Sequence, residues 1–137
     1  MSIRKPVVRH FIACEEVERS ADGRQYSLRN LLYAIAPPAG AAYPHGHPQI
    51  HLFALLTDAV GQIPLVLQIV MWEGTEERSI YTSEEVIIDF GTDPLKLPVW
   101  RIRLRNVPFE RPGLYEFYLL YRDEIIAREP LLLRDNP

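Results

Sequence analysis

The residues that decide the fold lie between Pro98 and Arg134, where the sequence reads PVWRIRLRNVPFERPGLYEFYLLYRDEIIAREPLLLR. Near the start of this stretch, apolar and basic residues alternate: Trp100, Ile102 and Leu104 with Arg101, Arg103 and Arg105. Successive side chains of a β-strand point to opposite faces of a sheet. The alternation therefore predicts a strand whose apolar face meets a core and whose arginines face water.

Two turns divide the rest of the stretch. Arg111-Pro112-Gly113 combines a residue of fixed φ with one that tolerates positive φ, which favours a turn before a strand over Leu114–Arg122. A second polar turn at Asp123-Glu124 precedes a third strand over Ile125–Leu133. Three strands joined by short turns predict an antiparallel sheet.

Working outward, the same alternation predicts five more strands, over residues 7–14, 24–36, 49–58, 63–73 and 80–90. Asp22-Gly23 favours a tight turn after the first of them. In the second, the phase slips near Asn30, which fits either a bulge or a helical turn over Leu28–Leu32. Pro37–Pro48 holds four prolines and two glycines, and we expect it to form a long loop.

This count predicts an all-β protein: a single antiparallel β-sandwich of about eight strands, immunoglobulin-like or C2-like, with residues 1–137 forming one domain. The composition agrees, because 47% hydrophobic and 24% charged residues are ordinary for a folded soluble chain. A length of 137 residues also suffices for one core.

The strands over 49–58 and 63–73 are apolar on both faces, and together they are expected to form a hairpin. A strand with one face in water should carry polar residues at every second position. The residues that cannot all share the core face with their neighbours are Phe53, Leu55, Val66, Val70 and Trp72. We interpret them as an interaction face that another protein or a second copy covers, unless the proline-rich loop covers it within the chain.

Charge and cysteine content restrict the function. A net charge of -3 provides no basic surplus for nucleic acid, and no apolar run is long enough for a membrane-spanning helix. Cys14 is the only cysteine, which excludes an intramolecular disulfide. The expected location is cytoplasmic, with no nucleic-acid or membrane partner.

A metal site is the sharpest chemical hypothesis. His45, His47 and His51 lie within the segment 43–51, and neutral imidazoles bind zinc, copper or nickel. No cysteine or carboxylate lies nearby in the sequence to complete the ligands. The alternative interpretation is a solvated polar loop with a partly buried His51, and we expect no cofactor.

The sequence predicts no enzyme. Nucleophilic catalysis needs a base beside the thiol, and a buried, inert Cys14 is favoured over a reactive one. The acidic residues Glu15, Glu16, Glu18, Glu84, Glu85 and Asp89 are interpreted as strand charges that pair across the sheet with Arg101, Arg103, Arg105 or Arg122. Nucleophile-elbow, phosphate-loop and dinucleotide motifs do not occur.

Two stretches carry a family resemblance: HFIACEEVERSADGRQYSLRNLLYAI at residues 10–35 and FERPGLYEFYLLYRDEIIAREPL at residues 109–131. They resemble a family of small uncharacterised bacterial proteins, a domain of unknown function. The resemblance implies a compact β-sandwich and provides no catalytic residues to carry over.

The function expected from these observations is a non-catalytic protein-interaction or structural module that self-associates through an apolar sheet face. The alternative is a small-molecule or metal-binding protein that uses the His-rich segment 43–51.

Overall fold

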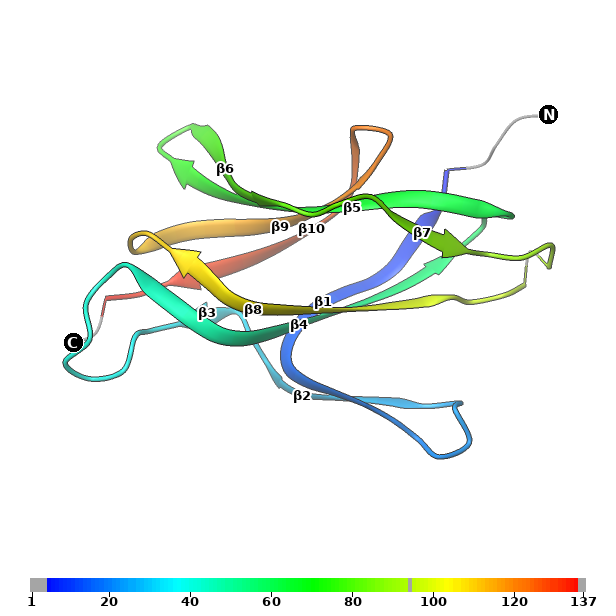
Figure 1. Ribbon diagram of the computed structural model, residues 1–137, viewed down its shortest axis with the longest axis horizontal. Helices are drawn as coiled ribbons and strands as arrows, with labels where there is room; N and C mark the ends of the chain where they lie inside the picture. The colour runs from blue at the N-terminus through cyan, green and yellow to red at the C-terminus, as the bar shows by residue number, and fades with distance from the viewer. Residues whose placement is uncertain (1–4, 94, 136–137) are drawn as a thin grey trace.

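A computed structural model describes residues 5–93 and 95–135, and within these ranges the regular structure is entirely β (Figure 1). The strands are β1 (Val7–Arg19), β2 (Tyr26–Leu31), β3 (Ala34–Ile35), β4 (His45–Thr57), β5 (Gln62–Glu73), β6 (Glu76–Thr82), β7 (Val86–Asp89), β8 (Val99–Phe109), β9 (Gly113–Tyr121) and β10 (Glu124–Leu133). The predicted all-β class is confirmed.

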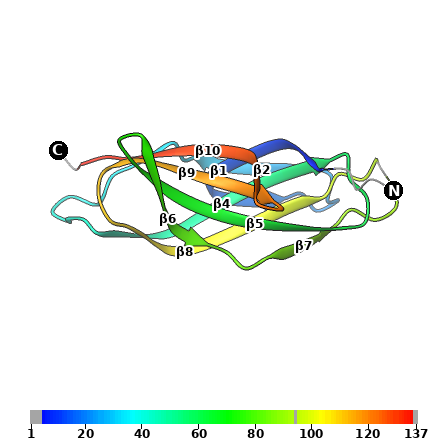
Figure 2. The same cartoon turned by 90° about the horizontal axis from the view of Figure 1, so that it is seen from above.

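The strands form two sheets that pack face to face. The four-stranded sheet has the order β2-β1-β4-β8, and the six-stranded sheet has the order β3-β10-β9-β5-β6, with β7 also paired to β5 (Figure 2). The pairings are antiparallel except that of β3 with β10, which is parallel. Two packed sheets with connections that cross between them are the immunoglobulin-like architecture that was predicted.

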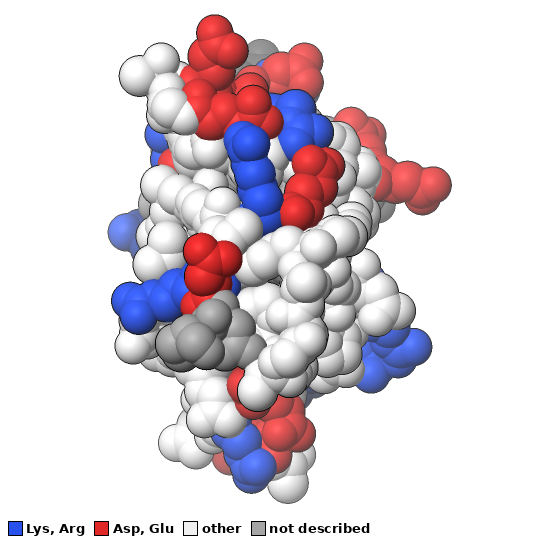
Figure 3. Space-filling view, turned by 90° about the vertical axis from the view of Figure 1, so that its left-hand side faces the viewer, with Lys and Arg blue, Asp and Glu red and all other residues white. Residues whose placement is uncertain are grey.

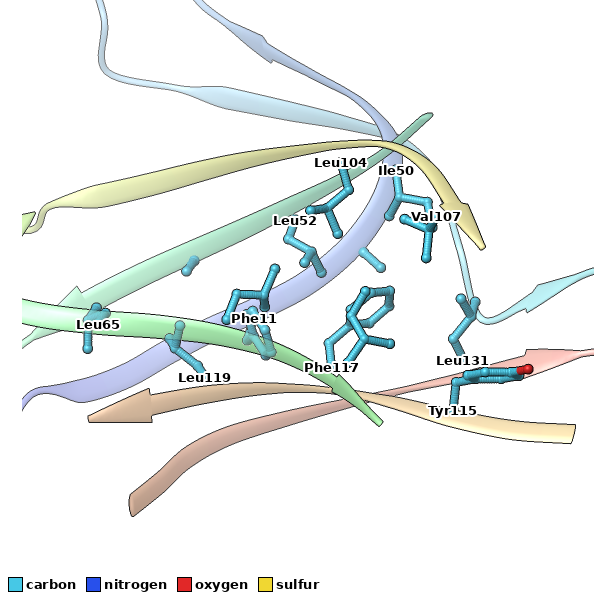
Figure 4. Packing of buried hydrophobic residues seen from close by; sticks show 14 of the residues in the cluster. Phe11, Ile50, Leu52, Leu65, Leu104, Val107, Tyr115, Phe117, Leu119 and Leu131 are labelled. Carbon is cyan, nitrogen blue, oxygen red and sulfur yellow. The ribbon is translucent and has the colours of Figure 1, made fainter. Parts of the chain in front are cut away.

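The core lies between the sheets and is built from alternate residues of each strand. β4 contributes Ile50, Leu52, Ala54 and Leu56, and Figure 4 shows such side chains meeting others from the opposite sheet. Leu104 of β8 and Phe117 of β9 are among these buried residues. Trp100 and Ile102 pack against the same core, and Arg101, Arg103 and Arg105 are exposed, as the alternation predicted.

Two predicted strands are each divided in the structure. Residues 24–36 give β2 and β3, which belong to different sheets, and Asn30 adopts a left-handed φ of 54° shortly before the chain crosses over. The helical alternative at Leu28–Leu32 is therefore wrong. Residues 80–90 lie along one edge of β5 as β6 and β7, with an interruption at Ser83, whose hydroxyl accepts the Leu67 N–H at 2.9 Å.

The predicted hairpin between residues 49–58 and 63–73 is wrong. β4 belongs to the four-stranded sheet and β5 to the six-stranded sheet, so the turn between them crosses the sandwich instead of joining paired strands. Asp58 and Gly61 take the positive φ values, 66° and 80°, in this connection. Alternation indicates only that each strand has a buried face. Two strands of a hairpin and two strands in opposite sheets both have one, so the alternation does not distinguish them.

The expected loop over Pro37–Pro48 is shorter than predicted. β4 begins at His45, because residues 45–50 find partners along β8, with His45 opposite Phe109 and Ile50 opposite Leu104. The irregular part ends at the cis Tyr43–Pro44 peptide bond. A proline is tolerated in this strand because the adjoining segment of β4 pairs with β8 alone.

The two turns around β9 lie within one residue of their predicted positions. Tyr115 is fully buried, and its hydroxyl donates to the Arg111 carbonyl at 2.7 Å, four residues upstream. This contact is the tyrosine corner typical of immunoglobulin-like sandwiches. At the next turn Arg122 and Asp123 have φ values of 49° and 64°, as a two-residue type I′ hairpin requires.

β1 is shared between two partners. Its first half, to Cys14, pairs with β4, and its second half pairs with β2 along the opposite edge. The β1–β2 hairpin therefore leaves the body of the sandwich as an arm, seen below the other strands in Figure 1. The predicted Asp22-Gly23 turn lies at its tip, with Gly23 at φ 74°. We call residues 15–31 the arm.

Candidate binding surfaces

The three predicted metal-ligand histidines do not converge. The imidazoles of His45 and His47 contact each other, with Nε2 and Nδ1 3.3 Å apart. His51 lies six positions along the same extended strand from His45, which at about 3.3 Å per residue is about 20 Å away. Within the described residues, no three His, Cys, Asp or Glu side chains are placed to hold an ion. The extended conformation of residues 45–51 keeps the three histidines from meeting at one ion.

Cys14 lies where β1 passes from β4 to β2. It is fully buried, and its Sγ donates to the Glu16 carbonyl at 3.4 Å. Burial raises the pKa of this thiol, which keeps it protonated and unreactive near neutral pH. The prediction that Cys14 is buried is confirmed.

The predicted interaction face is divided between the two outer faces of the sandwich. Phe53 and Leu55 lie on the outer face of the four-stranded sheet, whereas Val66, Val70 and Trp72 lie on the outer face of the six-stranded sheet. The prediction of a single face is wrong for the same reason as the predicted hairpin, because β4 and β5 lie in different sheets. One partner surface cannot contact all five residues.

On the four-stranded sheet, Phe53 is covered by the chain itself, whereas Leu55 is half-buried. Tyr26 of the arm packs on Phe53, with ring centroids 5.2 Å apart, and Phe53 is only 7% exposed. The covering segment is the arm and not the proline-rich loop. Phe53 is therefore explained without a partner.

The part on the six-stranded sheet belongs to a larger apolar surface. Its apolar members come from β5, β9 and β10, and we call them the outer apolar face: Val66, Val70, Trp72, Leu114, Tyr118, Leu120 and Leu132. Val70 and Tyr118 are buried within this face at 1% exposure, so Val70 needs no partner to cover it. Leu114 and Leu132 are directly opposite each other and are 42% and 37% exposed. A hollow of about 530 Å³ lies at one side of this face. Its lining is mixed, with Val66, Leu120 and Ile125 beside polar residues such as Gln68 and Glu85.

Two donors on this face have acceptors within the chain. The Trp72 indole N–H donates to Glu116 at 2.8 Å, and the Tyr118 hydroxyl donates to Glu77 at 2.5 Å. Burial and this acceptor raise the pKa of Tyr118 to about 12. The Arg128 guanidinium lies 5.2 Å from the centroid of the Tyr118 ring, a cation–π distance.

A groove lies between the arm and the strands β4 and β8 of the same sheet. Its volume is about 430 Å³, and its lining is Glu15, Glu16, Val17, Arg29, Asn30, Gln49, His51 and Arg103. The His51 Nδ1 atom is buried without a hydrogen-bond partner in the described chain, and burial followed by the charge of Arg103 lowers the pKa of His51. His51 is therefore neutral at pH 7.

The acidic residues of the arm pair locally. Arg29 lies 3.1 Å from Glu18 and 3.7 Å from Glu16, and Glu15 accepts a hydrogen bond from Asn30 at 3.0 Å. The expectation that Glu16 and Glu18 pair with the β8 arginines is wrong, because the arm provides a nearer arginine on its own second strand.

Charges of both signs also mix at the end of the molecule shown in Figure 3. Arg78 and Arg111 lie 3.0 Å and 3.1 Å from Glu73 near the β5–β6 turn. These pairs are exposed, and such pairs contribute little to stability. They leave no patch of one sign on this face.

The sequence interpretation missed Leu114 and Leu132. They occur next to core residues in β9 and β10, and in a sequence they read as parts of ordinary apolar strands. Alternation from the buried Tyr115 and Leu131 would have placed both on the outer side. Only the pairing of β9 with β10 places them opposite each other.

The comparisons with known proteins support the fold. A model of a family of unknown function, DUF6941, matches residues 9–134. No curated protein matches the chain in sequence. The part of the chain that the structure describes has no helix long and apolar enough to cross a membrane.

Among solved structures, the chain is similar to the alkylpurine DNA glycosylase AlkC of Pseudomonas fluorescens bound to DNA with an abasic site analogue, with 13% identity and a TM-score of 0.53 over 94% of this chain and 30% of the glycosylase. It thus spans under a third of that protein. An immunoglobulin-like protein of Pseudomonas aeruginosa gives 12% identity and a TM-score of 0.48 over 98% and 100% of the two chains. A β-glucosidase of Listeria innocua gives 11% identity and a TM-score of 0.43 over 90% and 16%.

Proposed function

The chain belongs to the DUF6941 family of unknown function, and from this premise we propose that it is a non-catalytic interaction module that self-associates through its outer apolar face. The observation that supports the proposal is the directly opposed pair Leu114 and Leu132, exposed on the same side as Trp72. Exposed apolar surface that crosses several strands is typical of a protein-binding site.

The partner that we propose is a second copy. Two polar groups of the face already have acceptors in the chain, since Glu116 accepts from Trp72 and Glu77 accepts from Tyr118. Closing the face against an apolar surface would therefore leave neither the indole N–H nor the hydroxyl without a hydrogen-bond partner. A two-fold dimer provides such an apolar surface, because it places the same face on both sides of the contact.

Analytical ultracentrifugation tests the proposal. We expect the wild-type chain to form a dimer, and the double variant Leu114→Glu/Leu132→Glu to sediment as a monomer with an unchanged β-type circular dichroism spectrum. A matched control is Val60→Glu/Leu97→Glu, which places the same charges at residues 48% and 57% exposed in the segments that precede β5 and β8.

The control variant should remain a dimer. A wild-type chain that stays monomeric at high concentration would contradict self-association. So would a dimer that both double variants disrupt equally.

A further inference from the structure

β8 forms an edge of the four-stranded sheet. This strand of 11 residues pairs with β4 along one side, and no described strand pairs with its other side. An edge strand presents unpaired backbone N–H and C=O groups that can pair with another extended chain. Adding a strand to such an edge is a common way of binding peptides.

The outer face of β8 carries a row of cations. Arg101, Arg103 and Arg105 lie opposite Phe53, His51 and Gln49 of β4, and all three are exposed. Alternate residues of a strand are about 7 Å apart, so the guanidiniums are evenly spaced. None forms an ion pair with a described residue, and Arg103 donates to the Gln49 side-chain oxygen at 2.9 Å.

The opposite face of the same strand borders a groove with a mixed lining. The groove has a volume of about 410 Å³ and runs beside β8 toward β6 and β7. Its apolar lining is Leu67, Tyr81, Val86, Trp100, Ile102 and Leu104, and its polar lining is Ser83, Glu84, Arg101 and Arg103. Trp100 and Ile102 are partly exposed there, although they pack against the core. A strand added to β8 would therefore have cations on one side and apolar side chains on the other.

We propose that the free edge of β8 binds an extended segment of another protein in which acidic and apolar residues alternate. The segment adds to the four-stranded sheet as a new edge strand. Its Asp or Glu side chains meet Arg101, Arg103 and Arg105, and its apolar side chains enter the groove beside Trp100 and Ile102. Opposite charges directly across two strands are favourable, and the backbone pairs as in any sheet.

A second copy of β8 does not fit this edge. Antiparallel pairing centred on Arg103 would place Arg101 opposite Arg105 and Arg103 opposite itself. Like charges directly across two strands are destabilising. The arginines thus disfavour self-pairing in this register and favour an acidic chain.

The binding experiment uses the full chain and a synthetic nine-residue peptide in which Glu alternates with Val, measured by fluorescence anisotropy. The comparison peptides have the same composition with the glutamates contiguous, or Lys in place of Glu. We expect the alternating acidic peptide to bind at least tenfold more tightly than either. Equal binding of the alternating and contiguous peptides would overturn the proposal.

Charge reversal tests the arginines. Arg101→Glu/Arg105→Glu leaves the Arg103–Gln49 hydrogen bond in place and should weaken binding of the acidic peptide at least tenfold while it strengthens binding of the Lys peptide. Arg122→Glu/Arg134→Glu makes the same change of charge elsewhere and should alter neither. If the first variant unfolds, Arg101→Gln/Arg105→Gln is measured instead, with a loss of at least threefold expected.

Amide hydrogen exchange separates strand addition from simple charge attraction. The backbone amides of β8 that exchange in the free chain should become protected with the acidic peptide. Binding without protection would overturn strand addition. All binding measurements are repeated on the Leu114→Glu/Leu132→Glu variant, so that they do not depend on whether the chain self-associates through the outer apolar face. If that variant is still a dimer, and the dimer is lost when Arg101→Glu/Arg105→Glu is added, a second copy binds at β8. This outcome would overturn the proposal.

Discussion

Glu129 is a carboxylate on the inner side of β10, in the part of this strand that pairs with β9 alone and has a free edge. It lies opposite Phe117, which is fully buried in the core, and burial raises the pKa of Glu129 above its usual value of 4.5. An inward-pointing charge on an edge strand discourages pairing with other chains. The same charge makes the folded state less stable when it is ionised.

We therefore expect Glu129→Gln to increase the free energy of unfolding at pH 7. Because the folded-state pKa is raised, the favourable contribution of Glu129 to the free energy of unfolding is fully present below about pH 4.5. This contribution is lost as the pH rises through the folded-state pKa. The difference between variant and wild type should shrink toward zero in acid. Urea unfolding at a series of pH values measures it, with the exposed Glu84→Gln as control. A difference that does not depend on pH would contradict this interpretation.

Tyr115 fixes the turn between β8 and β9 through one hydroxyl. That hydroxyl donates to the Arg111 carbonyl at 2.7 Å and accepts from the Arg111 N–H at 3.3 Å. Tyr115→Phe removes both contacts and leaves two backbone groups without a partner. We expect a loss of about 1–2 kcal/mol in the free energy of unfolding.

Chemical denaturation checks this loss, with Tyr81→Phe as the control because Tyr81 is 39% exposed. The control should change stability by less than about 0.5 kcal/mol. Equal effects of the two substitutions would argue against a structural role for the corner.

At the scale of elements, the arm decides which apolar surface is free. β1 changes partner at Cys14, and the arm then turns back so that Tyr26 covers Phe53. The alternation in β4 indicates that Phe53 needs a cover, and it cannot indicate whether this comes from the chain or from a partner. In this protein a segment 27 residues away in the sequence provides it.

Removing that cover should destabilise the arm. We expect Tyr26→Ala to lower the free energy of unfolding by about 1–2 kcal/mol, since an aromatic pair contributes about 0.5–1.5 kcal/mol beyond the buried area. Amide exchange in β2 should also accelerate. Tyr33→Ala is the control, because Tyr33 is 75% exposed and its side chain covers little. If both variants lose the same stability, Tyr26 is not the cover of Phe53.

At the scale of the whole molecule, the two proposed surfaces belong to different sheets. The outer apolar face lies on the six-stranded sheet, and the arginine row lies at the free edge of the four-stranded sheet. A dimer through the first surface would leave the second accessible. The net charge of -3 does not indicate the arginine row, because a small total charge is compatible with a local row of cations.

The strand predictions succeeded where each strand has one buried face. Trp100, Ile102 and Leu104 alternate with arginines, and β8, β9 and β10 occur as predicted. The prediction failed for the start of β4, because the composition of residues 45–48 favours a loop and their strand conformation comes from pairing with β8. It failed again for the metal site, because that site was predicted from a loop that could bring three histidines together.

What the sequence by itself determined is therefore the extended conformation of most strands and the side of each that faces the core, because these follow from a period of two residues. Which strands share a sheet was decided only by the tertiary structure, since β4 and β5 satisfy the same alternation whether they pair or lie in opposite layers. The free surfaces follow from that choice. Contacts between residues distant in the chain place Val66, Val70 and Trp72 on another sheet than Phe53 and Leu55. Contacts of the same kind bring Leu114 and Leu132 onto the face of Trp72.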